Sequence, residues 1–552
     1  MHFFATITAY KEVFMKIRGF LMALFLAPAL AAGPLQVDDL TPEELIGQTL
    51  VVRIDAGQQA PYEQAVKSGL IGTVLIKGGL TGQEDPAAKR AQTLQTIRQL
   101  RQWEKDSRHQ IPLLIAFDYE SGSVISPLFL GMKRLPSNML LGAGQSQKTV
   151  RAVYGAAADE IRALGGQINF APDLDVNTNP NNPIIGTRSF GAWPQGVAQN
   201  AQAAVKGLQA RQVAAFAKHF PGHGDTAVDS HTGSPVTDLP LKELMEQHIA
   251  PFRAAIDAGI WGIMSSHVIY PALDKEHPAT FSRRILTDLL RGELGFEGVI
   301  ATDSLDMEGA KRANGTPQAV LEAYQAGADM PLIGKDLPYD TIAYIQAQYG
   351  KTLSPQRLKQ SARRVWELKQ KTGLFTPQAK PKKQTDFEKS ALQAARRGVT
   401  LVKGKPFAKR PQSVCAVFFT EPALEYMLPE FTQTLEEARV KTQSVFVPMS
   451  PEPEELSAAR ACAKEQQTLV IGSYQKYGTP DSAQQQIINT LLKENPGAVF
   501  ISLLSPYDLA FYPQAQTALA LYGPTPQTLR TAAEILLGKR KAQGSLSPAL
   551  SR

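Results

Sequence analysis

Cysteine is scarce in this sequence, because only Cys415 and Cys462 occur among its 552 residues. Neither cysteine directly follows the apolar stretch near the N-terminus, so a lipid-modified cysteine at the mature N-terminus is not supported. An exported chain can join the two thiols in a disulfide, and a pair of buried free thiols is the alternative that the sequence leaves open.

Blocks of basic residues and long apolar runs are missing as well. The net charge of +7 is spread along the chain, without a dense Lys/Arg block or an interleaved aromatic stripe, so we expect a solvated surface and no nucleic-acid partner. Beyond the N-terminal segment, no run approaches the ~18 uninterrupted apolar residues of a membrane span. The composition, 43% apolar and 20% charged, indicates a globular protein with one large and one smaller domain.

The N-terminal segment has the pattern of a targeting signal. In the run MKIRGFLMALFLAPALAAG, which starts at Met15, Lys16 and Arg18 precede an apolar stretch and then the small residues Ala29-Leu30-Ala31. This order predicts a signal peptide over 1–31, with translation starting at Met15 and cleavage near Ala31. We therefore expect export to the periplasm or the cell exterior, without stable membrane insertion after cleavage. An uncleaved anchor is the alternative.

Short apolar runs then alternate with longer amphipathic stretches, which is typical of a parallel βα protein. Eight runs are expected to be strands and to close a (β/α)8 TIM-like barrel over 38–375: 49–55, 72–79, 112–118, 168–176, 214–220, 262–268, 298–304 and 328–334. Barrel enzymes carry their chemistry at the C-terminal ends of the strands. Seven of these runs hold a polar residue near that end: Asp55, Lys77, Asp118, Asp175, His219, His267 and Asp303.

A basic, Pro-containing stretch predicts a linker over 376–395, and the βα pattern resumes in 396–552. We expect a smaller αβα sandwich there, with a mainly parallel sheet of five strands: 413–419, 443–449, 468–474, 498–504 and 518–523. No Gly-rich loop opens its helices, so nucleotide binding has no support. The expected role of this domain is to pack against the barrel and shape one side of its cleft.

Histidines gather in the run KHFPGHGDTAVDSH over 218–231, which holds three of the eight in the chain. Asp229 precedes His231 by two residues, a spacing at which a carboxylate fixes the imidazole tautomer and raises its basicity. The glycines on either side of His223 predict a sharply bent loop, in which that histidine either shapes the loop or acts in catalysis.

A zinc site is the competing interpretation of this cluster. Its ligands would be His219, His223, His231 and Asp229. However, the HxxxH spacing falls across a Pro-Gly break instead of along a helix face, and no His-x-His follows the first strand. We therefore expect no metal and no other cofactor.

Five motifs stand in order within residues 40–375: FDYESG, PDLDVNTNPNNPIIGTRSFG, KHFPGHGDT followed by DSH, SSHVIYPALD and GVIATDSLDMEGA. Together they resemble the successive signatures of family 3 glycoside hydrolases, specifically of their β-N-acetylglucosaminidase branch. The later ARRGVTLVKGK and LLSPYDLA resemble the second, αβα domain of that family. The resemblance implies a retaining exo-β-N-acetylglucosaminidase, a β-N-acetylhexosaminidase that forms a covalent glycosyl-enzyme intermediate.

Catalytic roles follow from the resemblance residue by residue. Asp303 is implied as the nucleophile, with Asp306 as the alternative. His231 of the DSH triplet is implied as the acid/base, and Asp229 as the residue that orients it. A neutral base avoids placing a second anion against the carboxylate that leaves the intermediate.

Substrate contacts are implied in the same way. Asp118 is expected to accept hydrogen bonds from sugar hydroxyls, Lys218 and His219 to donate them, and Arg188 to contact the sugar or its neighbour, while His267 is expected to help line the pocket. One departure stands out. Family members read DQEGGRV where this chain reads DYESGSV, so Ser121 and Ser123 replace a glycine and an arginine, which puts affinity or substrate range in question.

The implied substrate is terminal β-linked GlcNAc of peptidoglycan fragments, and chitin-derived oligosaccharides are the alternative. Phosphate in place of water as the acceptor stays open, because a neutral His231 does not repel it. A catalytically inactive glycan-binding protein is a further alternative. The sequence does not indicate an oligomeric state.

Overall fold

The computed structural model describes residues 36–78, 85–120, 122–124, 126–233, 235–376, 384–449, 451, 453–466, 468–477 and 480–546. The predicted signal peptide lies outside them. The chain forms two compact units, 1–40 and 41–552, and of the elements only the 3-10 helix Val37–Asp39 belongs to the first. Among the described helices, none combines the length and the apolar character that crossing a membrane requires.

Eight parallel strands close into a barrel in sequential order, which confirms the predicted fold class. Each predicted range contains one of them: β1 Val51–Asp55, β2 Thr73–Lys77, β3 Leu114–Phe117, β4 Ile168–Asn169, β5 Ala214–Phe220, β6 Gly262–Ser265, β7 Val299–Ser304 and β8 Met330–Leu332. Strand β4 is much shorter than its predicted range of 168–176. Beyond it the chain leaves the ladder, apart from one isolated bridge between Asp173 and Lys218.

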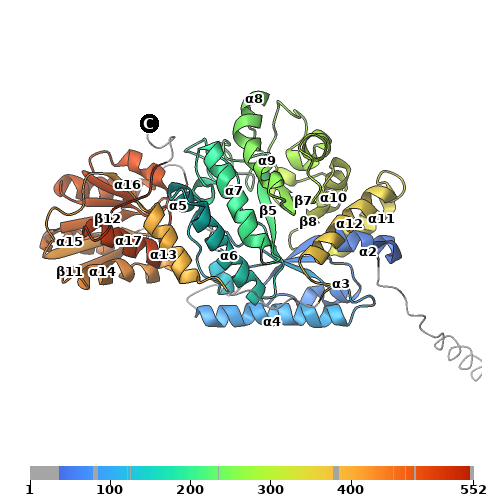
Figure 1. The fold of residues 1–552 in the computed structure, drawn as a ribbon, viewed down its shortest axis with the longest axis horizontal. Coiled ribbons are helices and arrows are strands. Elements are labelled where there is room, and N and C mark those ends of the chain that lie inside the picture. The colour runs from blue at the N-terminus through green and yellow to red at the C-terminus, as the bar shows by residue number, and fades with distance from the viewer. Residues whose placement is uncertain are drawn as a thin grey trace, which may run out of the picture. The chain divides into compact units, whose positions relative to one another are not determined.

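Helices surround the barrel (Figure 1). They are α2 Pro42–Thr49, α3 Glu63–Lys67, α4 Pro86–Lys105, α5 Asn138–Ala143, α6 Gln147–Ala163, α7 Pro194–Gln209, α8 Leu241–Glu243, α9 Ala250–Asp257, α10 Gly315–Ala326, α11 Pro338–Gln348 and α12 Pro355–Lys371, with π-helical turns at Leu244–Ile249 and Arg284–Glu293. Local sequence sets several starts. The Ser146 side chain caps α6 and that of Ser354 caps α12, where each accepts a hydrogen bond from a backbone N–H of the first turn.

The barrel interior is filled by apolar side chains. Leu114, Phe170, Phe216 and Met264 are among those that pack together, and the rings of Phe170 and Phe216 meet edge to face at 5.2 Å. The barrel is thus a packed core and not a pore. Polar side chains at the ends of the strands consequently gather at its C-terminal mouth.

The second domain has a six-stranded sheet in the order β11-β10-β12-β13-β14-β9. Its strands are β9 Thr400–Lys403, β10 Ser413–Phe419, β11 Lys441–Val447, β12 Thr468–Ser473, β13 Val499–Ser502 and β14 Thr517–Ala520. The predicted count of five strands was wrong, because it omitted the edge strand β9, which pairs antiparallel with β14. Because β9 has only four residues and three of them are partly or fully exposed, it lacks the apolar run of a buried strand.

Successive side chains of β10 point to opposite faces of the sheet, and helices cover both faces. Cys415, Val417 and Phe419 share a core with α15 Pro453–Glu465 and α16 Ser482–Glu494, while Phe418 meets Phe431 of α14 on the other face. The remaining helices of this domain are α13 Phe387–Gly398, α14 Pro429–Glu436 and α17 Pro526–Leu536. Helix α13 begins inside the predicted linker range and packs on α5 and α6 of the barrel, so the part of that range from Phe387 onward is not a linker (Figure 1).

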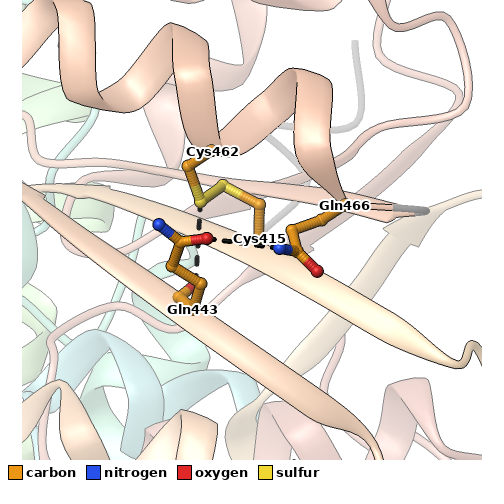
Figure 2. Close-up of a disulfide and its surroundings, with 4 residues drawn as sticks. All are labelled: Cys415, Gln443, Cys462 and Gln466. Atoms are coloured by element: carbon orange, nitrogen blue, oxygen red, sulfur yellow. Dashed lines mark hydrogen bonds between the residues drawn. A yellow bond between two sulfur atoms is a disulfide. The ribbon is translucent and has the colours of Figure 1, made fainter.

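A disulfide joins Cys415 of β10 to Cys462 of α15 (Figure 2). Both residues are fully buried, and their Cα atoms are 5.7 Å apart. Of the two alternatives that the sequence left open, the structure therefore has the disulfide. It ties a helix to the sheet that it covers and closes a loop over a sequence separation of 47 residues.

Candidate active site

A cavity of about 160 Å³ lies at the C-terminal mouth of the barrel. Strands β2, β5 and β7 contribute side chains to it, and so do the loops that follow β3, β4 and β5. Its lining residues are Lys77, Asp118, Glu120, Val124, Ile184, Ile185, Arg188, Lys218, His219, His223, Ser230, His231, Asp303 and Tyr477. All predicted catalytic and substrate-binding residues except Asp229 and His267 are among them.

Asp303 stands near the end of β7 with its side chain 22% exposed. The backbone N–H of Ser304 donates to its Oδ1 at 2.8 Å, and its Oδ2 lies 3.8 Å from Nε2 of His219. Burial raises the pKa of Asp303, but the histidines around it, led by His219, outweigh burial and lower that pKa to about 2. The carboxylate is therefore ionised at neutral pH and open to the cavity, as a nucleophile must be.

Asp175 fixes the position of His219. Its Oδ2 accepts from Nδ1 of His219 at 2.7 Å, and its Oδ1 accepts from the backbone N–H groups of His219 at 3.1 Å and His223 at 2.6 Å. Burial raises the pKa of Asp175, yet the charge and hydrogen bond of His219 hold that pKa far below its usual value. The ionised Asp175 keeps the proton of His219 on Nδ1, so Nε2 points toward Asp303 and Arg188.

His231 and Asp229 form a hydrogen-bonded pair on the loop after β5. Nδ1 of His231 lies 2.7 Å from Oδ1 of Asp229, which also accepts from the backbone N–H of His231 at 2.8 Å. The hydrogen bond that Nδ1 of His231 donates to Asp229 raises the pKa of His231. Because Asp229 occupies Nδ1, Nε2 is the atom left for proton exchange, and the 54% exposed imidazole lines the same cavity as Asp303.

Opposite charges alternate along the side of the cavity that holds the residues predicted to bind substrate. Asp118 lies between two lysines, with Nζ of Lys77 at 3.0 Å and Nζ of Lys218 at 3.1 Å, and Lys218 also reaches Glu120 at 2.9 Å. Burial opposes ionisation of Asp118, but the two ammonium groups lower its pKa strongly. Burial likewise lowers the pKa of Lys218, while Asp118 and Glu120 raise it by more. Both groups are charged at neutral pH and suited to bind hydroxyl groups.

Arg188, in the 3-10 turn Gly186–Arg188, makes a two-point ion pair with Glu120. Its Nε and Nη2 donate to the two carboxylate oxygens at 3.0 and 3.1 Å, and Nη2 lies 3.4 Å from Nε2 of His219. Glu120 was not assigned a role from the sequence. The available signal was its place two residues after Asp118 in the segment FDYESG.

Two further histidines take different places. His223 lines the cavity, but its Nδ1 is 2.8 Å from the Thr226 hydroxyl and its Nε2 is 3.1 Å from that of Ser230. Burial lowers its pKa to about 4, so it is neutral at pH 7 and holds the loop together. His267 does not line the cavity. It is 1% exposed, and its Nε2 donates to the Ser304 carbonyl at 3.0 Å, so it supports the end of β7 from behind.

The second domain contributes Tyr477, which the sequence did not indicate because no motif places it near the barrel. Its hydroxyl is hydrogen-bonded to that of Ser123, one of the two serines at the departure from the family pattern. Ser121 lies outside the described residues. Asp306, the alternative nucleophile, is exposed and does not line the cavity.

Of the described residues, one group has the geometry to hold a metal: Asp173, Asp175 and His219, whose ligand atoms lie within 4.8 Å of one another. Burial and then Asp175 raise the pKa of Asp173 far above its usual value, and a protonated acid is not a ligand. Arg188 lies 3.6 Å from Asp173 and already supplies positive charge there. His223, His231 and Asp229 are not part of the group, so the zinc interpretation gains no support.

Comparison with known proteins identifies the class. Residues 41–368 match the Glycosyl hydrolase family 3 N terminal domain, and this match covers more than half of the chain. The chain belongs to glycosyl hydrolase family 3 and is a glycoside hydrolase.

Relatives match over most of the chain. It is 31% identical to beta-hexosaminidase A of Pseudoalteromonas piscicida in an alignment of 519 positions, gaps included, which covers 83% of this chain and 86% of that protein. It is 29% identical over 509 residues to a beta-N-acetylglucosaminidase/beta-glucosidase of Cellulomonas fimi, at 85% and 87% coverage. A solved family 3 beta-N-acetylglucosaminidase from Paenibacillus sp. str. FPU-7 superposes with a TM-score of 0.80 and 29% identity, covering 92% of this chain and 98% of that one.

Proposed function

We propose that the protein is a retaining exo-β-N-acetylhexosaminidase that releases terminal β-linked GlcNAc. The observation that carries this proposal is that Asp303 and His231 line one small cavity. The names of the relatives support the sugar. The cavity volume of about 160 Å³ supports the exo mode, because it is below the ~300–1,000 Å³ typical of sites for larger ligands and suits a single terminal sugar.

In the proposed first step, a carboxylate oxygen of Asp303 attacks the anomeric carbon while the bond to the leaving oxygen breaks. His231 protonates that oxygen through Nε2, and Asp229 stabilises the imidazolium before the transfer. In the second step the neutral imidazole takes a proton from water, whose oxygen displaces Asp303 from the sugar. Asp118, Lys218, His219 and Arg188 hold the sugar hydroxyls through both steps.

Covalent trapping tests this assignment. A fluorinated, activated glycoside that forms the intermediate quickly and releases it slowly is expected to add one sugar mass to Asp303, found by mass spectrometry of a peptic digest. Asp306→Asn is a control that keeps the labelling, while Asp303→Asn loses it. Label on another carboxylate, or turnover by Asp303→Asn at the wild-type rate, refutes the nucleophile.

The proposed natural substrate is a peptidoglycan fragment, and the proposed compartment is the periplasm or the cell exterior. The signal-like sequence at 15–33 and the Cys415–Cys462 disulfide support export, because disulfides persist in oxidising compartments. Fractionation of producing cells, with the mass of the mature N-terminus, tests the compartment. Release of GlcNAc from muropeptides and from chitooligosaccharides, compared at equal concentration, tests the substrate.

Phosphorolysis is a second candidate reaction, favoured by the imidazole acid/base. A neutral His231 and the cations Lys77 and Arg188 tolerate an anionic acceptor that a carboxylate base would repel. If phosphate is the acceptor, adding it yields GlcNAc 1-phosphate as the main product. Free GlcNAc at an unchanged rate excludes this route.

A further inference from the structure

A second cavity, of about 190 Å³, lies beside the N-terminal end of α7 and carries none of the chemistry described above. It is bounded by α5, by the segment that leads into α7, by Tyr522 of the second domain and by the C-terminal residues Ser545 and Leu546. None of the described residues that line it is charged. This property sets it apart from the first cavity, where nine acidic, basic or histidine side chains meet, and excludes an anionic or cationic ligand held by ion pairs.

An exposed tryptophan forms one wall. Trp193 is 46% exposed, whereas most large apolar side chains in a protein of this size are buried. Its ring rests against Gly196, where an added Cβ would meet the ring at 2.6 Å. Because Gly196 has no side chain, the indole ring can pack directly against the helix there. The exposed remainder of the indole lines the cavity.

Amide groups form the polar side of this cavity. Gln199 and Asn200 follow Gly196 by three and four residues on α7, so all three lie on one face of the helix. Nε2 of Gln147 donates to Oε1 of Gln199 at 3.0 Å, which leaves the Gln147 oxygen and the Gln199 amide nitrogen for a ligand.

Asn200 provides an independent sign that the cavity takes a polar ligand. The residue is only 4% exposed, it lines the cavity, and its Oδ1 has no hydrogen-bond partner among the described residues. A buried oxygen without a donor costs about 1 to 3 kcal/mol, which a rotation of the Asn200 amide toward a ligand hydroxyl or amide in the cavity would recover. A purely apolar ligand would leave that oxygen unpaired.

We infer that this cavity binds a neutral oligosaccharide at a site separate from the active site. A sugar ring offers an apolar C–H face to Trp193 and hydroxyl groups that both donate to Asn200 and Gln147 and accept from Gln199. The segment from Arg188, in the first cavity, to Trp193, in the second, spans at most about 18 Å when extended. A glycan bound at the second site is thus kept near the first.

The test is a fluorescence titration with chitotetraose and, in a second arm, cellotetraose. The Asp303→Asn background prevents hydrolysis during the titration. Of the four tryptophans, Trp103 and Trp366 are 5% and 8% exposed, so Trp193 is expected to give the main response. Binding of both sugars indicates recognition of the ring face and hydroxyls, and binding of chitotetraose alone indicates recognition of the acetamido group. Either result supports the site.

Matched variants decide the outcome. Trp193→Phe is expected to lose the fluorescence change but keep calorimetric binding, Trp193→Ala to weaken binding at least about tenfold, and the exposed Gln147→Ala to weaken it less. Each Trp193 and Gln147 variant is also made in protein that keeps Asp303. Hydrolysis of an aryl GlcNAc by that protein shows that the variant folds. No Trp193-dependent response to either sugar, or equal affinity in Trp193→Ala, overturns the inference. Failure of the proposed function is a distinct result, namely no aryl GlcNAc hydrolysis with the Trp193 response intact.

Discussion

Replacing His231 with alanine tests the acid/base role most directly. The side chain is half exposed, and among the described residues its ring is hydrogen-bonded to Asp229 alone, so its loss should not unfold the protein. For a substrate with a poor leaving group, such as a GlcNAc disaccharide, kcat/KM is expected to fall by about 10²- to 10⁴-fold, which is about 2.7 to 5.4 kcal/mol.

An activated aryl glycoside should behave differently. A 4-nitrophenolate leaves without protonation, so its kcat/KM, which reports the first step, should change little. Its kcat should fall, because the variant lacks the base that activates water in the second step. Azide, an anionic nucleophile that needs no base, should restore kcat and yield the glycosyl azide.

The chain offers a matched control at His277. Its side chain is 51% exposed, it pairs with Asp274 at 3.4 Å, and it does not line the cavity. His277→Ala should leave both substrates at wild-type rates. Equal losses on the disaccharide and the aryl glycoside in His231→Ala, or no rescue by azide, would refute the reasoning.

Other perturbations give further tests. Asp229→Asn replaces the charged acceptor whose hydrogen bond raises the pKa of His231 with a neutral one, so the alkaline limb of the pH–rate profile for poor leaving groups should move to lower pH; an unmoved limb contradicts the pair. Removing both cysteines of the Cys415–Cys462 disulfide should lower the free energy of unfolding by about 4 kcal/mol for its loop of 47 residues, measured by urea denaturation. Burial lowers the pKa of His248, whose two ring nitrogens have no hydrogen-bond partner among the described residues, so the unfolded state takes up the proton first and stability is lost as pH falls below about 6.5. His248→Phe should lose less stability than the wild type between pH 7 and 5, and parallel losses would contradict this.

The sequence predicted the barrel well because its signal is local. Strand β5 has the bounds of its predicted apolar run, and β7 lies within its own range one residue later at the start. Since barrel strands end at one mouth, the polar residues near those ends predicted a shared site, and Asp118, Lys218, His219 and Asp303 do meet there.

What the sequence missed depends on contacts between distant segments. The range 168–176 looks like a long buried strand, but most of it leaves the ladder and instead places Asp173 and Asp175 beneath the cavity. His267 ends an apolar run as Asp118 does, yet its side chain lies behind β7, because a strand-end position does not determine which layer a side chain enters.

Tyr477 has a consequence for how this enzyme can be altered. One wall of the cavity comes from a segment more than 100 residues away in sequence from the barrel strands, and the hydroxyl of Tyr477 in that segment is hydrogen-bonded to the hydroxyl of Ser123. An excised barrel would therefore keep Asp303, His231 and Asp229 but lack that wall. Exchanging Tyr477 would reshape the wall and leave those three residues unchanged.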